Sequence, residues 1–140
     1  MRYRLLLAAT LLTGCGQSTA TLPAALEGRF QSEGVVRRAD DQVFRYTYYS
    51  RSTRGNRWED RDASIIVTAR SVFVHKNGKV GLDLTPASRK ENAVRREGDR
   101  VVISSGSGQS RVSWSFRPPE DAHGWTEDIR RVLAAADSAR

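Results

Sequence analysis

The chain carries few residues of the types that perform chemistry, and their spacing argues against a metal site or a hydrolytic site. Its two histidines, His75 and His123, are far apart in the sequence, and its single cysteine lies close to the N-terminus. A zinc site needs three or four converging ligands, and neither histidine has a second ligand at a matching spacing. No serine has a glycine two residues away on both sides, as a nucleophile elbow requires. We expect both histidines to be surface or helix-capping residues, with no metal and no cofactor.

The densest charged segment lies between residues 52 and 62. It combines three carboxylates, three arginines and one tryptophan: Glu59, Asp60 and Asp62; Arg54, Arg57 and Arg61; and Trp58. The run Arg54-Gly55-Asn56 is typical of a loop, so we predict a mixed-charge loop in preference to a catalytic carboxylate pair or a cation site. An apolar ring among charges is either a lid over the core or an exposed contact. Trp58 and its three arginines are therefore the candidate contacts for a partner.

The N-terminal residues have the order of a secretion signal. Arg2 and Arg4 precede an uncharged apolar stretch over residues 5 to 12, and small residues follow it. That order is typical of an export signal. The stretch is shorter than the roughly 20 residues that span a bilayer, so we expect no permanent transmembrane helix there.

The segment Leu12-Thr13-Gly14-Cys15 resembles the lipobox of bacterial lipoproteins. The resemblance implies cleavage between Gly14 and Cys15 and attachment of a diacylglyceryl group to the Cys15 thiol. The alternative is an ordinary cysteine at the end of a plain secretory signal. A single cysteine excludes an internal disulfide, and two acyl chains provide a stable anchor where one is marginal. In Gram-negative lipoproteins an aspartate after the cysteine favours the inner membrane, so Gly16 implies the periplasmic face of the outer membrane.

The composition fits one exported domain. Residues 1 to 14 contain two arginines and no acid, so their removal lowers the formal net charge from +7 to +5. Only three of the 23 basic residues are lysines. Guanidinium groups suit phosphate and carboxylate, so an anionic lipid or glycan is one candidate partner. The alternative is that the arginines reflect genome base composition, with solvated charges on strand faces. We expect no nucleic-acid partner for a tethered, exported chain.

The remaining chain divides into a tether over residues 15 to 25 and a β-rich domain over residues 26 to 140. Alternating apolar residues predict about seven strands, and Asn77-Gly78 is a strong hairpin signal. Further hairpins are predicted at Glu97-Gly98-Asp99 and Gly106-Ser107-Gly108. Pro119 suits the first turn of a C-terminal helix, whose apolar residues recur every three or four positions. They are Ala122, Trp125, Ile129, Val132, Leu133 and Ala136.

The order of these elements over residues 64 to 136 resembles the pleckstrin-homology family, in particular its bacterial and GRAM-like members. In that family a final strand with a phenylalanine, here Phe116, leads into a capping helix with a tryptophan, here Trp125. The resemblance implies one small bent antiparallel sheet of about seven strands, closed by one C-terminal amphipathic helix and used as a binding module. The basic residues Arg37, Arg38 and Arg45 match the family's lipid site only loosely. A lipocalin-like barrel is the alternative fold, suggested by Gly28-Arg29-Phe30.

These observations predict a membrane-anchored envelope lipoprotein that acts as a non-catalytic binding or accessory module. Its expected partner is an envelope protein or an anionic lipid or glycan. One alternative is an inhibitor that inserts residues 52 to 62 into the cleft of an envelope hydrolase. A small enzyme is the least favoured alternative.

Overall fold

A computed structural model describes residues 22–50, 53–76, 78–85, 91–107 and 110–135 of this protein. The secretion signal, its cleavage position at Gly14 and the lipid attachment position at Cys15 lie outside the described residues.

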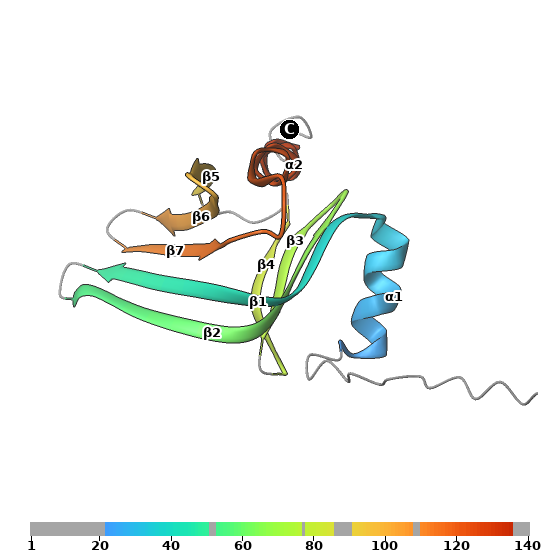
Figure 1. The fold of residues 1–140 in the computed structure, drawn as a ribbon, viewed down its shortest axis with the longest axis horizontal. Coiled ribbons are helices and arrows are strands. Elements are labelled where there is room, and N and C mark those ends of the chain that lie inside the picture. The colour runs from blue at the N-terminus through green and yellow to red at the C-terminus, as the bar shows by residue number, and fades with distance from the viewer. Residues whose placement is uncertain (1–21, 51–52, 77, 86–90, 108–109, 136–140) are drawn as a thin grey trace, which may run out of the picture.

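The described chain forms one antiparallel sheet and two helices (Figure 1). The spatial order of the seven strands is β4-β3-β2-β1-β7-β6-β5. The elements along the chain are α1 (Ala24–Glu33), β1 (Val35–Ser50), β2 (Thr53–Thr68), β3 (Val72–Lys76), β4 (Lys79–Leu84), β5 (Glu91–Glu97), β6 (Arg100–Ser107), β7 (Ser110–Phe116) and α2 (Ala122–Ala134). The predicted fold class, a strongly bent seven-stranded sheet with one C-terminal helix, is confirmed.

Two aspartates bend the long hairpin formed by β1 and β2. Asp41 and Asp62 have φ values of 56° and 58°, and aspartate tolerates this left-handed region better than most residues. The register between the two strands shifts at the same place, between Ala39 and Phe44, as in a β-bulge. On one side of the bend, residues 45–49 of β1 pair with β7. On the other side, residues 64–67 of β2 pair with β3. The hairpin therefore joins both halves of the sheet and curls it into a half-barrel (Figure 1).

The main core lies on the inner face of the curled sheet, under α2. Trp125 is 2% exposed and meets the ring of Phe116 edge-on, with 5.3 Å between ring centroids. Ile129 and Val132 are buried beside it, and Ala122 and Leu133 pack against the same cluster. The predicted apolar stripe thus covers the sheet, although Ala136 lies outside the described residues.

The start of α2 differs from the prediction. The helix begins at Ala122, so Pro119 precedes it. Asp121 caps the helix, because its Oδ1 accepts a hydrogen bond from the Gly124 backbone N–H at 2.9 Å. A Cβ at residue 124 would lie 2.1 Å from Asp121 Oδ2 and 2.6 Å from Arg37 Nη2. Glycine therefore leaves room for the cap and for Arg37, which bonds to Asp121 and Asp128 and ties β1 to α2.

Helix α1 and the residues before it were not predicted, and part of the predicted tether belongs to the packed body. Leu22 is 6% exposed and forms a second apolar cluster with Phe30, Ile66 and Phe73. This cluster lies on the outer face of β2 and β3, because Ile66 pairs with Phe73 and both alternate with core residues. The packed body therefore begins no later than Leu22, and not at residue 26.

Glu33 at the end of α1 fastens the helix to the sheet. It accepts hydrogen bonds from Arg29 Nε at 2.7 Å, Thr68 Oγ1 at 2.7 Å and Ser71 Oγ at 2.6 Å. Arg29 also makes two hydrogen bonds to Asp83 of β4. Burial acts to raise the pKa of Glu33, but these hydrogen bonds outweigh it and lower the pKa to about 2.

The hairpin predictions are confirmed where the structure describes them. Lys76 pairs with Lys79 across the turn that contains Gly78, and Gly78 has a φ of 71°. Glu97 pairs with Arg100 around Gly98, and Ser107 pairs with Ser110. In the first two turns glycine supplies the positive φ, which is 71° at Gly78 and 62° at Gly98.

Candidate functional site, an arginine-lined groove

The segment predicted as a loop over residues 52 to 62 is mostly strand. From Thr53 onward it belongs to β2, and it pairs with β1 through Tyr46–Trp58 and Thr47–Arg57. Its polar residues are compatible with a strand because this part of the hairpin extends beyond the core, where one face stays open to solvent. The prediction of a loop that enters a partner's cleft therefore loses its structural basis.

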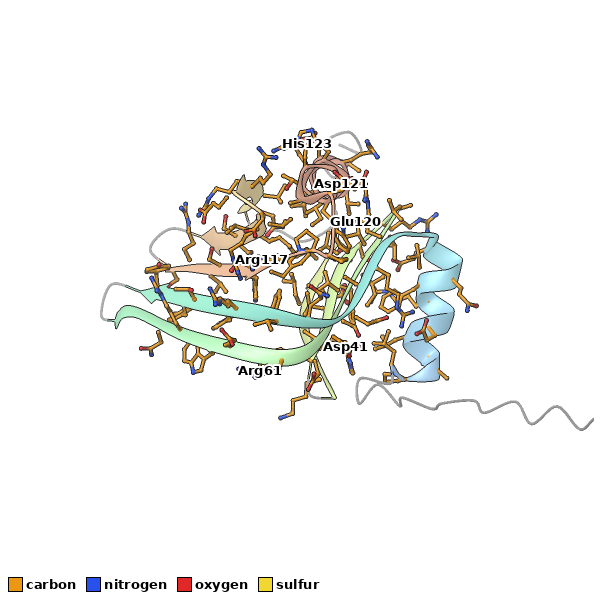
Figure 2. The ribbon with its side chains drawn as sticks, viewed as in Figure 1. Asp41, Arg61, Arg117, Glu120, Asp121 and His123 are labelled. Carbon is orange, nitrogen blue, oxygen red and sulfur yellow. The ribbon has the colours of Figure 1, made fainter. Side chains whose placement is uncertain are left out.

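The strand separates the residues that the sequence grouped together. Successive side chains of a strand point to opposite faces, so Arg57 and Glu59 lie on the face opposite Trp58 and Asp60. Glu59 pairs with Arg45 at 3.0 Å, and Asp60 pairs with Lys76. The two carboxylates therefore do not form a catalytic pair. Arg61 is 80% exposed and approaches Glu59 only to 4.0 Å. It lies on β2, away from Arg117, the residue that follows β7 (Figure 2). The side chain of Arg54 lies outside the described residues.

Trp58 lies at the rim of the core. Its ring is 5.2 Å from that of Tyr46, which is 6.2 Å from that of Trp114 on β7. The three rings form one row across β2, β1 and β7 because the residues are register partners. Trp58 is nevertheless 49% exposed, so one edge of the row remains accessible.

One predicted surface histidine is buried. His75 on β3 is 4% exposed, because it points to the outer face beside Ser64, its register partner on β2. We predicted a surface position because His75 stands one residue before the end of its strand, next to the hairpin turn. His123 is exposed at the start of α2, as predicted (Figure 2).

One face of the described sheet carries a groove that we name the arginine groove. Its main cavity has a volume of about 510 Å³. The lining residues come from five neighbouring strands: Arg45, Tyr46 and Thr47 of β1; Arg57, Trp58 and Glu59 of β2; Glu97 of β5; Arg100 of β6; and Ser115 of β7. A second cavity of about 150 Å³ shares Thr47, Glu97 and Ser115 with it.

The strand register explains why this face is hollow. One row across the sheet reads Arg95, Val102, Ser115, Arg45 and Glu59, from β5 to β2. The short side chains of this row therefore lie on β6 and β7, and long charged side chains rise from β5 on one side and from β1 and β2 on the other. The neighbouring row on the other face includes Ile103, Trp114 and Tyr46, which pack in the core. The groove consequently lies on the face of the sheet opposite the core.

Arg100 is the unusual charge in this groove. Its Nη2 donates to Ser115 Oγ at 3.3 Å, and no carboxylate of the described chain lies within ion-pair distance. Partial burial, followed by the positive charges of Arg45 and Arg117, lowers the pKa of Arg100. Charged groups that are partly desolvated normally have a partner. The positive charge of the Arg100 guanidinium is therefore only partly compensated by negative charge from the surrounding residues.

The other charges of the groove are mostly matched. Arg45 pairs with Glu59, and Arg95 pairs with Glu97 at 2.7 Å. Arg57 makes no ion pair within the described part of the chain, and it is exposed. The sequence identified Arg57 as a candidate contact but missed Arg100, because the burial of Arg100 depends on strands that are distant in the sequence.

The fold and the groove define a small bent-sheet protein with a positively charged, hydroxyl-lined depression on its outer face. No protein-family model matches the chain, and no curated protein matches it. Within the described ranges, no helix is both long and apolar enough to cross a membrane. No group of three or more histidine, cysteine, aspartate or glutamate residues in that part of the chain is arranged to hold a metal ion.

Proposed function

We propose that this protein is a lipid-anchored lipoprotein of the bacterial cell envelope that acts as a non-catalytic binding module for an anionic partner. The anchor is supported by the sequence alone: a signal-like segment followed by Leu12-Thr13-Gly14-Cys15. The binding role is supported by the arginine groove. The single observation that carries it is Arg100, a partly buried guanidinium without a carboxylate partner in the described chain.

The anchor would hold the body close to the membrane surface. Leu22, the first buried residue of the described chain, lies seven positions after Cys15. A fully extended chain spans at most about 3.5 Å per residue, so Leu22 would lie within about 25 Å of the lipid attachment point. In a Gram-negative organism the absence of aspartate at residue 16 favours the periplasmic face of the outer membrane.

Two experiments test the two parts of this proposal. For the anchor, Cys15→Ala should move the protein from the membrane fraction to the soluble fraction; a variant that stays in the membrane would refute the anchor. For the groove, inorganic phosphate should bind to the full chain in detergent, and Arg100→Gln should weaken binding at least about tenfold, since a charged hydrogen bond contributes about 1.5–3 kcal/mol. Equal binding by both proteins would refute the groove as the binding surface.

A further inference from the structure

We propose that the arginine groove binds a saccharide that carries one phosphate group, with the phosphate at Arg100 and Arg57 and a sugar ring beside Tyr49. This inference rests on the binding function proposed above and names the class of its ligand.

The phosphate position follows from the two arginines without carboxylate partners. Arg100 and Arg57 line the same cavity, from β6 and β2, and β1 and β7 lie between them with Arg45, Thr47 and Ser115. Within the described chain Arg100 bonds only to Ser115, and Arg57 forms no ion pair. Guanidinium groups bind phosphate oxygens through paired N–H donors. An anion between these arginines would supply the negative charge that Arg100 lacks.

The carboxylates in the groove limit how much negative charge a ligand can carry. Glu59 and Glu97 line the same cavity as Arg100, and they would repel a ligand with several phosphates. Carboxylates accept hydrogen bonds from hydroxyl groups. The hydroxyls of Thr47, Ser113 and Ser115, which line the two cavities, both donate and accept. The lining therefore matches a ligand that combines one anionic group with several hydroxyls.

Tyr49 provides a flat surface in the second cavity, next to this polar floor. A Cβ at Gly55 would lie 2.9 Å from Tyr49 Cε1, so the ring packs closely over the glycine. Gly55 has a φ of 47°, a conformation that favours glycine. Tyr49 is still 46% exposed. An aromatic ring beside convergent polar groups is the usual lining of a small-molecule site, and its apolar face suits the C–H face of a sugar ring.

Calorimetric titration of the full chain in detergent tests this inference with three probes: N-acetylglucosamine 1-phosphate, N-acetylglucosamine and inorganic phosphate. The sugar phosphate should bind at least about tenfold more tightly than either of the other two. Arg100→Gln and Arg57→Gln should each weaken its binding at least about tenfold. Arg57 is exposed, so its substitution leaves the core intact. Arg70→Gln, which removes the same charge from the exposed turn between β2 and β3, should bind like the wild type.

Substitutions of Tyr49 distinguish binding of the sugar ring from binding of the phosphate group. Tyr49→Ala should weaken sugar phosphate binding at least about fivefold and leave phosphate binding unchanged, whereas Tyr49→Phe should retain both. If phosphate alone binds as tightly as the sugar phosphate, or if Tyr49→Ala has no effect, the saccharide inference is wrong while the anion-binding function stands. If phosphate does not bind, both proposals fail.

A lipid headgroup is the other source of a phosphate. Cys15→Ala protein, which lacks the proposed anchor, should bind vesicles of phosphatidylglycerol no more tightly than vesicles of phosphatidylcholine. Tighter binding to phosphatidylglycerol that Arg100→Gln abolishes would assign the groove to lipid and overturn the saccharide.

Discussion

At the scale of single residues, the groove contains a side chain whose position opposes folding. Arg100 is partly buried and is repelled by Arg45 and Arg117. Its lowered pKa means that the protonated form is less favourable in the folded state than in the unfolded state. That cost is present at every pH below the folded-state pKa, and therefore throughout the neutral range. Residues that reduce stability in this way are common at binding sites.

Substitution of Arg100 should therefore stabilise the fold while it removes binding. We expect Arg100→Gln to raise the free energy of unfolding by about 0.5 kcal/mol or more, as measured by urea denaturation at pH 7 without ligand. Arg70→Gln, an exposed charge outside the groove, should change it by less. A destabilised Arg100→Gln protein would show that Arg100 serves the fold and not a ligand.

Glu33 has the opposite character, because the fold favours its charged form. Its pKa falls from 4.5 to about 2 on folding, so its contribution to stability is complete above about pH 5 and is lost as the pH falls towards 2. The shift corresponds to about 3 kcal/mol at most. We expect Glu33→Gln to lower stability at pH 7 by about 2 kcal/mol and to flatten the decline between pH 5 and pH 2. Urea denaturation across this range measures both effects.

The control for this prediction is Glu120→Gln, at an exposed position ahead of α2 (Figure 2). It should retain the stability and pH profile of the wild type. An unchanged pH profile in Glu33→Gln would contradict the assignment of acid sensitivity to α1.

At the scale of elements, local signals predicted some elements well and others not at all. The turn glycines at residues 78 and 98 and the apolar stripe of α2 are visible in short windows, and each formed as expected. Helix α1 has no such stripe, because only Phe30 is buried within it and Gly28 weakens its helix propensity.

Short windows of sequence predict the candidate site even less well than they predict the elements. Arg57 stood out because of its charged neighbours, but its place in a strand followed from pairing with Thr47. Arg100 lies about 40 residues further along the chain. Its place in one groove with Arg45 and Glu59 depends on the order of four strands, β2, β1, β7 and β6, which no local pattern encodes. The first half of β2 was missed because its polar composition resembles a loop, whereas its pairing partner makes it a strand.

Two tryptophans provide a matched test of how elements pack. Trp125→Ala should lower the free energy of unfolding by about 3–5 kcal/mol, because the ring is 2% exposed between α2 and the sheet. Trp58→Ala should cost only about 1 kcal/mol, since a half-exposed ring loses one aromatic contact. Equal costs in urea denaturation would contradict the description of α2 as the element that closes the core.

At the scale of the whole molecule, the proposed anchor and the groove belong to different parts of the chain. The groove faces away from the core on the outer side of β1, β7 and β6, whereas α1, which follows the N-terminal segment, covers the outer side of β2 and β3. Helix α1, the first helix of the described chain, and the groove therefore lie over different parts of the outer face of the sheet.

The proposed place of this protein in the cell envelope depends on the lipid at residue 15. Intact mass spectrometry of the protein extracted from its native membrane tests this most directly. We predict a chain that begins at Cys15 and carries the added mass of a diacylglyceryl group, with or without a further acyl chain on the new amino group. A chain that begins at any other residue, or a Cys15 with an unmodified thiol, would contradict the assignment of this protein to the lipid-anchored class.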